Sequence, residues 1–318
     1  MEKNAKKKGY TAGVLMVIIG GVMWGCSGTS GQYLFSHSDL TTLDFTCYRE
    51  LLAGVLLLAW CLLRKDPGIR GIWKDRKDVL QLVCYSFFGL IMVQFAYMNA
   101  ISYSNAGTAT VLQNLGAVLI MLLTCLKEKR YPGRKELLSL FLAVLGTWLI
   151  ATGGNPAQML ISPQGLLWGL LTACGVVAYT LIPMRIISKW GAKAVLAWGL
   201  IIGGGALTIA VRPWMRMVPL TAMDWAAAAV VILFGTVLAF NLYLSGANII
   251  GPVKASMLAT TEPLTATLLS FALLGTRFAL GSLLGFACIL ATVLLLAKPE
   301  SSSERIGKPV QEAVRHRI

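Results

Sequence analysis

The chain has 318 residues, of which 56% are hydrophobic and only 13% are charged, and its mean hydropathy is +0.70. A soluble protein of this size carries about 25% charged residues, because its surface must face water. The composition therefore excludes a cytosolic enzyme, a secreted domain and a disordered scaffold. It predicts an all-α integral membrane protein. The formal net charge of +14 comes from Lys and Arg residues that lie mainly between the apolar stretches.

Ten stretches of the chain are long and apolar enough to cross a bilayer, which takes about 20 mainly apolar residues. In chain order they are 11–34, 42–63, 79–101, 106–126, 137–153, 164–187, 193–211, 225–247, 252–274 and 279–297. Each is predicted to be a helix, because backbone polar groups in hydrocarbon must be satisfied within the segment. A glycine run, Gly203 to Gly205, interrupts the seventh stretch.

The basic residues lie almost entirely on one side of these stretches. Of the 28 Lys and Arg residues, 24 fall on the side of the N-terminus, and only Arg212, Arg216 and Arg277 fall on the other; Arg49 lies within a span. Because basic residues accumulate on the cytoplasmic side, we expect a multi-pass protein of the inner (plasma) membrane with both termini cytoplasmic. The positive charge is then a topology signal, so the expected partner is the lipid bilayer and not nucleic acid.

The second part of the chain repeats the pattern of the first. Tyr97–Ala151 aligns with Tyr243–Ala297 at an offset of 146 residues, in the leading tyrosine, the small residues and the hydropathy. The division predicts one five-helix repeat in 1–155, a second in 156–297, and a cytoplasmic tail in 298–318. Since five is odd, the second repeat enters the membrane from the opposite face. We expect ten transmembrane helices as two inverted five-helix repeats, with a substrate site near the midplane.

Six short motifs carry a family resemblance over about residues 11–297. They are GGVMWGCSG in 20–28, CYREL in 47–51, NAISYSNAGTATVL in 99–112, LKEKR in 126–130, GLLWGLLTACGVVAYTLIP in 165–183 and ASMLATTEPLTATLLS in 255–270. In this order the chain resembles the drug/metabolite transporter superfamily, specifically its ten-span EamA-type members. Gln113 and its neighbours stand where that family typically has a proline in span 4, whereas Glu262-Pro263 matches the pattern in span 9.

The resemblance implies a secondary transporter of a small organic metabolite that works by alternating access. Family members often export amino acids or related metabolites, so amino-acid export is the leading expectation. An uptake carrier or multidrug exporter of the same fold, and a flippase of a lipid-linked intermediate, are the alternatives within the fold. A membrane-embedded enzyme or signalling protein is the alternative outside it. Proton coupling and facilitated diffusion fit equally well, and the protein is expected to be a monomer or a homodimer.

Two ionisable residues within the spans are the candidates for coupling or gating. Glu262 lies about a third of the way into span 9, where a charge costs about 2.5–3.5 kcal/mol at the bilayer centre. Pro263 beside it removes one backbone hydrogen bond and predicts a helix kink that frees the carbonyl near residue 259. Glu262 can contact a substrate amine, hold a proton, or pin span 9 to a neighbour. Arg49 in span 2 serves either as an ion-paired packing residue or as a gate.

Polar and aromatic side chains on several spans are the candidates for lining a central cavity. Besides Glu262, this set comprises Trp24, Gln94, Tyr97, Asn114, Trp168, Tyr179 and Asn241. For each of them helix packing is the competing interpretation, because small and aromatic residues also let two helices approach closely. The pair Gly21 and Gly25 is interpreted as packing alone.

No motif for a cofactor, a metal or catalysis is visible in the sequence. The seven cysteines fall in apolar stretches without a CxxC pair, and no nucleotide-binding glycine loop is present. We therefore expect no cofactor, no metal and no enzymatic activity, and a small-molecule substrate as the partner.

Overall fold

The computed structural model describes residues 2–104, 106–129, 131–152, 154–155 and 162–274, together with short stretches between 280 and 291. Within these residues the chain is helical and contains no strand. Most of the predicted tenth span, 279–297, and the whole tail, 298–318, lie outside the described residues. The linker between the two predicted repeats is described only in part.

The first predicted repeat contains these helices in chain order: α1 (Glu2–His37), α2 (Thr42–Leu63), α3 (Gly68–Gly71), α4 (Arg76–Cys84), the π-helix η2 (Tyr85–Ile91), α5 (Met92–Ser102), α6 (Ala106–Glu128) and α7 (Arg134–Thr152). A short 3-10 turn, η1 (Ile72–Lys74), joins α3 to α4. Thr41 caps α2 by accepting a hydrogen bond from the Asp44 amide, which fixes where this helix begins. The five predicted spans of this part of the chain are all helical.

The second predicted repeat contains α8 (Pro163–Leu181), α9 (Met184–Trp190), α10 (Ala192–Val211), the 3-10 turn η4 (Pro213–Met215), α11 (Ala222–Ala229), the π-helix η5 (Val230–Leu238), α12 (Ala239–Ile250), α13 (Pro252–Leu258) and α14 (Thr261–Leu274). Thr221 and Asp224 form a capping box at the start of α11. Serine 162 caps α8, whose first residue is a proline.

Two of the predicted spans are interrupted by a turn. The stretch 164–187 turns at Ile182 and Pro183 between α8 and α9, and the stretch 252–274 turns at Ala259 and Thr260 between α13 and α14. Both turns lie at or shortly before a proline, which cannot donate the backbone hydrogen bond that continues a helix. Conversely, the glycine run Gly203–Gly205 does not interrupt α10.

Six helical stretches of the described chain are long and apolar enough to cross a membrane. They are Gly9–His37, Thr42–Leu63, Arg76–Ser102, Pro163–Trp190, Ala192–Met215 and Ala222–Ile250. About half of each stretch is buried inside the protein, and large apolar side chains such as Leu15, Leu63 and Phe88 remain exposed. An apolar exterior of this extent fits a bundle surrounded by lipid.

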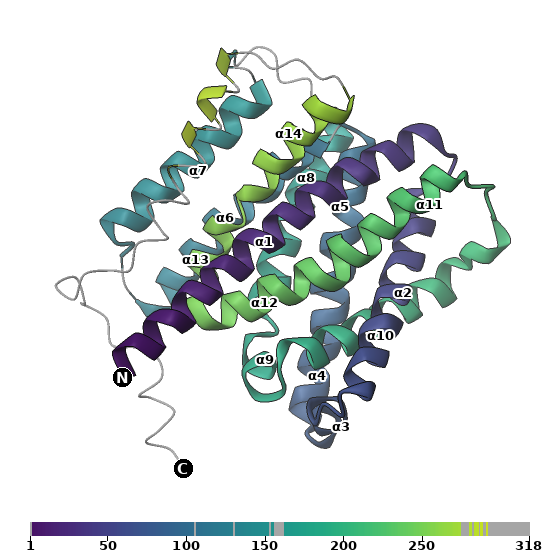
Figure 1. The fold of residues 1–318 in the computed structure, drawn as a ribbon, viewed down its shortest axis with the longest axis horizontal. Helices are drawn as coiled ribbons and strands as arrows, with labels where there is room; N and C mark the ends of the chain where they lie inside the picture. Colours follow the sequence, from purple (N-terminus) through teal and green to yellow (C-terminus); the bar gives the residue numbers. More distant parts are fainter. Residues whose placement is uncertain are drawn as a thin grey trace.

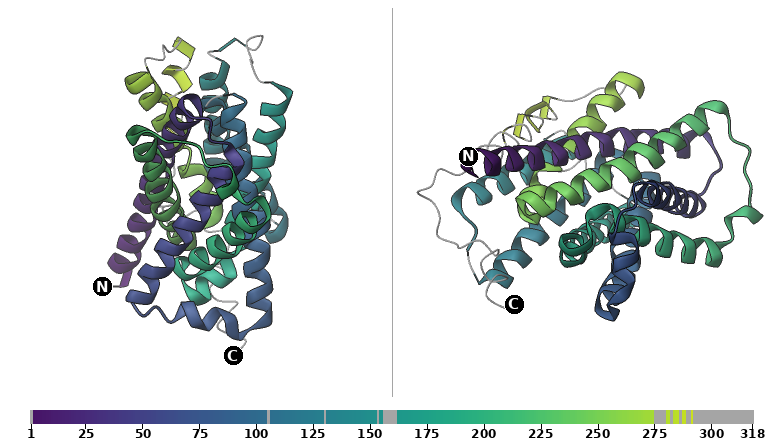
Figure 2. Two further views of the ribbon diagram at one scale, coloured as in Figure 1. Left: turned by 90° about the vertical axis from the view of Figure 1, so that its right-hand side faces the viewer. Right: turned by 60° about the horizontal axis from the view of Figure 1, so that its bottom comes forward.

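The helices of the two predicted repeats are interleaved in space. Figure 1 shows α7 along one edge of the bundle and α2 with α10 toward the other, and the views in Figure 2 show α1 crossing the bundle beside α12. In the same way α8 packs against α5 and α6, while α1 packs against α12 and α14. The core therefore forms between segments that are far apart in the sequence.

Glycines make the closest of these approaches possible. A Cβ atom at Gly204 of α10 would lie 2.7 Å from the Leu51 backbone nitrogen of α2, and one at Gly175 of α8 would lie 2.8 Å from the Val93 Cα of α5. These distances are shorter than a van der Waals contact, so only glycine fits. Small residues at helix interfaces in membranes serve the same purpose.

Two ends of the bundle are defined by the helix termini. At the His37 end, α1 and α5 finish and α2 and α6 begin; at the Trp190 end, α2 and α9 finish and α4 and α13 begin. Polar contacts join neighbouring helices at each end. Asp44 accepts a hydrogen bond from Arg216 at the His37 end, at 3.0 Å, and Asp78 accepts from Arg185 and Lys189 at the Trp190 end, at 2.6 and 2.7 Å.

We predict that Gly204→Ala lowers the thermal stability of the purified protein, because the added methyl group would meet the backbone of α2. Overpacking of this kind costs about 1–3 kcal/mol. The matched control is Gly205→Ala, where a Cβ atom meets nothing within 4 Å, so the better helix propensity of alanine leaves stability equal or higher. Thermal unfolding in detergent measures both; equal losses for the two variants would contradict the close packing of α2 and α10.

Candidate functional site

Glu262 lies at a break in the helix that the sequence predicted as span 9. The Glu262 amide donates a 2.9 Å hydrogen bond to the Ala259 carbonyl, which Pro263 would otherwise leave free because its ring nitrogen has no proton. α14 begins at Thr261, so the Glu262 carboxylate lies in the first turn of a helix, where the macrodipole favours negative charge. The break thus places a carboxylate, 3% exposed, inside the bundle.

Two glycines of α1 hold this break in place. A Cβ atom at Gly25 would lie 2.8 Å from the Glu262 carbonyl oxygen, and one at Gly21 would lie 3.3 Å from the Ala259 carbonyl oxygen. The interpretation of this glycine pair as a packing motif is confirmed. This packing places α1 directly against the helix break that carries Glu262.

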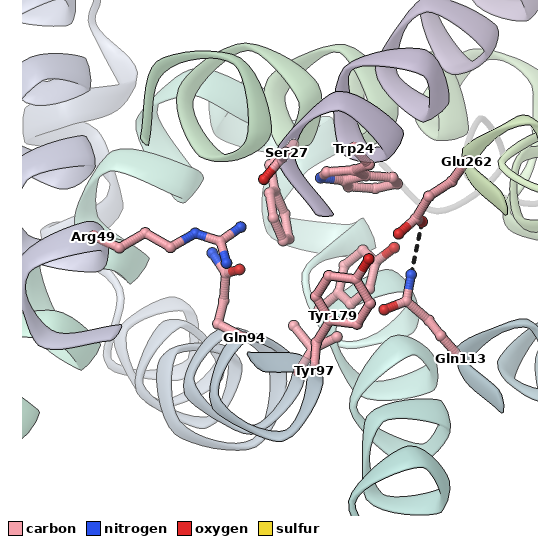
Figure 3. Close-up of a pocket in the computed structure, with 10 residues that line it drawn as sticks. Trp24, Ser27, Arg49, Gln94, Tyr97, Gln113, Tyr179 and Glu262 are labelled. Atoms are coloured by element: carbon pink, nitrogen blue, oxygen red, sulfur yellow. Dashed lines mark hydrogen bonds between the residues drawn. The ribbon is translucent and has the colours of Figure 1, made fainter. Parts of the chain in front are cut away.

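Within the described residues, the Glu262 side chain accepts a hydrogen bond from Gln113 of α6. Its Nε2 donates to Glu262 Oε2 over 2.7 Å, so the two residues join α6 to α14 across the interior (Figure 3). A hydrogen bond to a charged group is worth about 1.5–3 kcal/mol. This single bond bridges residues that are 149 positions apart in the chain.

Four aromatic rings form a cluster beside this bridge. The Trp24 ring lies 5.1 Å from both Phe240 and Tyr243 and 6.2 Å from Tyr179, measured between ring centroids. The Trp24 indole nitrogen donates to the Gly235 carbonyl over 2.9 Å, which fixes its orientation. Edge-on aromatic packing of this kind makes a rigid, apolar wall.

Arg49 lies on the opposite side of the same interior. It is only 2% exposed, and its Nε donates to the Thr236 hydroxyl over 2.7 Å. Thr236 in turn donates to the Val231 carbonyl five residues earlier, within the π-helix η5. Within the described part of the chain, Arg49 Nη1 and Gln94 Nε2 have no hydrogen-bond partner although both are buried. This side of the interior therefore presents two donors without acceptors.

The residues enclose two neighbouring cavities. The first has about 320 Å³ of empty volume and is lined by Trp24, Ser27, Arg49, Val93, Gln94, Tyr97, Gln113, Tyr179, Phe240 and Glu262. The second has about 290 Å³ and is lined by Trp24, Gln113, Asn114, Val176, Tyr179, Tyr243, Ser256, Ala259 and Glu262. Figure 3 shows the first cavity with Arg49 and Gln94 on one side and Glu262 and Gln113 on the other.

Four side chains line both cavities: Trp24, Gln113, Tyr179 and Glu262. The first cavity extends from them toward the His37 end, since Arg49 belongs to the second turn of α2, and the second cavity extends toward the Trp190 end, since Ser256 belongs to the short helix α13. We call these four residues the partition. It is the wall shared by two cavities that extend toward opposite ends of the bundle.

Most of the residues expected to line a cavity come together here. Trp24, Gln94, Tyr97, Tyr179, Glu262 and Arg49 line the first cavity, and Asn114 lines the second. Trp168 lines neither: its ring packs edge-on against Phe95, with centroids 5.2 Å apart. Asn241 lines neither as well, although its Oδ1 is buried without a partner in the described residues. The structure therefore places these two residues outside both cavities.

Sequence reasoning missed Gln113 as a site residue, although it is part of the partition. The available signal was that Gln113 stands where the family typically has proline in span 4. It also missed Ser27, Phe240, Tyr243 and Ser256 as lining residues. In the described residues no group of three or more His, Cys, Asp or Glu side chains could hold a metal ion.

Comparison with known proteins identifies the chain. The sequence model of the EamA-like transporter family matches residues 11–152 and again residues 163–298. The chain belongs to the EamA-like transporter family. The resemblance inferred from the motifs is thereby confirmed, and the protein is a membrane transporter.

Individual relatives agree with this assignment. The uncharacterized inner membrane transporter YicL of Salmonella typhimurium is 36% identical over 295 residues, which span 90% of this chain and 95% of YicL. The uncharacterized transporter YwfM of Bacillus subtilis is 25% identical over 286 residues, 89% of this chain and 93% of YwfM. A solved crystal structure superposes with a TM-score of 0.69 over 89% of this chain and 95% of its own, at 14% identity, which concerns the fold alone.

The hydrogen bond between Arg49 and Thr236 leads to a prediction about stability. Thr236→Val keeps the shape of the side chain but removes the acceptor of a buried guanidinium, so we expect a loss of about 1–3 kcal/mol. The matched control is Thr208→Val. The Thr208 hydroxyl also donates to α2, but its hydrogen bond to the Cys47 carbonyl is long, at 3.5 Å, and involves no charged group. Thermal unfolding of the transporter in detergent should separate the variants; a larger loss for Thr208→Val would argue against a role of Thr236 in holding Arg49.

Proposed function

We propose that this EamA-like transporter moves small zwitterionic metabolites, amino acids being the leading class, by alternating access. The observation that carries the proposal is the polarity of the first cavity. A guanidinium lies on one side and a carboxylate on the other, with aromatic rings between them. A ligand that is negative at one end and positive at the other fits this arrangement.

The Arg49 side suits a carboxylate. Arg49 Nη1 and Gln94 Nε2 are buried donors that lack an acceptor among the described residues. Leaving such donors unsatisfied costs about 1–3 kcal/mol each, and a bound carboxylate supplies acceptors for both. An arginine beside an amide is suited to this task, because guanidinium groups bind carboxylates with directional hydrogen bonds.

The Glu262 side suits an ammonium group. Its carboxylate accepts a hydrogen bond from Gln113 in the present state, and a substrate ammonium offers a stronger, charged donor. When the ammonium takes the place of the Gln113 amide, the link between α6 and α14 is released. Substrate binding then loosens the partition that separates the two cavities, which ties occupancy to conformational change.

The arrangement of helices supports an inverted repeat as the basis of this motion. α4 begins at Arg76 and α11 begins 146 residues later, at Ala222. α6 begins at Ala106 and α13 begins 146 residues later, at Pro252. The sequence alignment has the same offset. The π-helices η2 and η5 fall at the same offset to within one residue. The packing is equivalent too, because α1 packs on α12 and α14 as α8 packs on α5 and α6.

The orientation of the protein in its membrane is proposed from the distribution of basic residues. With the Trp190 end in the cytoplasm, the basic loops lie inside and the first cavity lies toward the outer face, as the positive-inside rule requires. The relative YicL is named an inner membrane transporter, and we propose the same membrane here, with both termini cytoplasmic. Export is the proposed direction.

The test of the substrate class is counterflow in proteoliposomes. Vesicles loaded with a mixture of amino acids should take up labelled external amino acids, whereas amino-acid methyl esters, which lack the carboxylate, should neither exchange nor compete. Gln94→Leu removes one unsatisfied donor, so it should weaken the apparent affinity about 10-fold or more. The matched control is Trp168→Phe, which lies outside both cavities and should leave exchange unchanged.

Each other outcome points elsewhere. A flat counterflow trace across a broad amino-acid panel would remove the proposed class. Equal competition by esters and free amino acids would remove the carboxylate contact, and transport of lipophilic cations would favour a multidrug exporter of the same fold. A comparison of metabolites released by cells with and without the protein identifies the substrate directly.

The inverted arrangement makes a separate prediction about topology. A single cysteine introduced near residue 156 in a cysteine-free background should react with an impermeant maleimide added outside intact cells. A cysteine near residue 318 should react only after the membrane is opened. Labelling of position 156 from the cytosol alone would exclude two oppositely oriented halves.

A further inference from the structure

Glu50 is a second carboxyl group buried in the bundle, and it lies outside both cavities. It is adjacent to Arg49 on α2 but faces α10, since consecutive residues of a helix point about 100° apart. Its side chain is 0% exposed. A Cβ atom at Gly204 would lie 2.8 Å from the Glu50 Cβ, and one at Gly203 would lie 3.2 Å from Glu50 Oε2, so two glycines of α10 make room for this side chain.

The surroundings of Glu50 are polar but do not satisfy it. Neither of its carboxyl oxygens has a hydrogen-bond partner within the described residues, and the buried hydroxyl of Tyr85 has none there either. The Ser86 carbonyl oxygen lies 3.2 Å from the same Cβ position at Gly203 that Glu50 Oε2 approaches. Tyr85 and Ser86 open the π-helix η2, and π-helical turns occur frequently at functional sites.

Within the described part of the chain no Lys, Arg or His side chain forms an ion pair with Glu50, although the Arg49 guanidinium is close enough to act on it electrostatically. Arg49, on the same helix, lines the first cavity and donates its Nε to Thr236. The other titratable groups near Glu50 are Cys47 on α2 and Tyr85 on η2, which add no positive charge. α10 between Ala194 and Val211 and η5 contain no titratable side chain. An ionised carboxylate without donors is too costly inside such an interior, so the carboxyl group is held neutral.

We propose that Glu50 is a proton-binding site of this transporter, separate from the substrate cavity. With α2 packed on α10 as described here, the proton is enclosed. When the two helices separate, water reaches the carboxyl group and the proton leaves it for the solvent; on closure a proton from solvent returns. The bond made and broken is the O–H bond of the carboxyl group, and no further reactant is needed.

The position of Glu50 links this site to substrate binding. Arg49 and Glu50 are consecutive residues of one helix, so a shift of α2 that moves the guanidinium in the cavity also moves the carboxyl group against α10. Release of the Glu50 proton is thereby tied to the state of the cavity. This second step rests on the proposed transport function, whereas the proton site itself does not.

Infrared spectroscopy of the purified full-length protein tests the site without any transport assay. Near neutral pH, we expect a carbonyl band of a protonated carboxyl group that shifts in D2O. It should be absent from Glu50→Gln and present in Gln94→Leu, which alters the cavity but leaves Glu50 intact. Glu50→Gln should unfold at the same temperature as the unaltered protein, because it exchanges one neutral group for another of the same shape.

Three results would overturn the assignment. If the spectrum of Glu50→Gln retains the whole protonated-carboxyl band, Glu50 is ionised in the protein. If Glu50→Gln unfolds at a clearly lower temperature and its spectrum loses no protonated-carboxyl band, Glu50 is a charged structural residue. Sodium ions that raise the unfolding temperature of the unaltered protein but not of Glu50→Gln would identify a metal-ion site instead of a proton site, and this too would overturn the proposal.

Proteoliposomes then test the link to transport. A pH gradient should drive net accumulation of amino acids by the unaltered protein, and Glu50→Gln should retain exchange while losing at least 10-fold of the gradient-driven accumulation. Gradient-driven accumulation that survives in Glu50→Gln would exclude coupling through this residue. If the unaltered protein exchanges no amino acid at all, the proposed substrate class fails while the infrared result on Glu50 stands.

Discussion

The cost of a polar group without a partner in an apolar interior is the constraint on which this structure depends. In water an unsatisfied donor finds a solvent molecule, but inside a bundle surrounded by lipid it finds only protein or ligand. The transporter concentrates its buried polar groups in the cavity and at the interface of α2 with α10. Arg49, Gln94, Glu50 and Glu262 are all nearly inaccessible. The incomplete partners of Arg49, Gln94 and Glu50 are the observations on which the proposed substrate and proton sites rest.

Close helix packing and broken helices together make these polar positions possible. Glycines of α1 contact the turn at Ala259 and Thr260, and glycines of α10 contact the backbone of α2. Without a side chain at these points, the helices approach closely enough to exclude lipid and enclose a carboxyl group. The break before α14 supplies a helix N-terminus for Glu262, and the π-helix η5 supplies the hydroxyl that holds Arg49. Irregular backbone thus occurs where the charged side chains lie.

The partition is the part of the interior that the two cavities share. Trp24, Gln113, Tyr179 and Glu262 border both cavities, and they come from α1, α6, α8 and α14. Within the partition, a hydrogen bond from Gln113 to Glu262 joins α6 to α14. Because its acceptor is a carboxylate, the bond is stronger than one between two neutral groups.

Much of the architecture could be predicted from the sequence, because composition and periodicity report on the solvent around a chain. Low charge and long apolar stretches imply helices in lipid, the motifs imply the EamA-like family, and Glu262 with Pro263 marks an irregular helix carrying a charge. Periodicity also identifies which face of a helix is polar, which is why Trp24, Gln94, Tyr97 and Tyr179 were among the expected residues.

What the sequence could not determine is which helix each face meets. Trp168 and Asn241 carry the same kind of signal as Tyr179, yet they line neither cavity. Gln113 completes the partition by bonding to a residue 149 positions away. The seclusion of Glu50 from the cavity likewise depends on how closely the glycines of α10 approach α2. Contacts between distant segments follow from the packing of whole helices, and only the tertiary structure decides them.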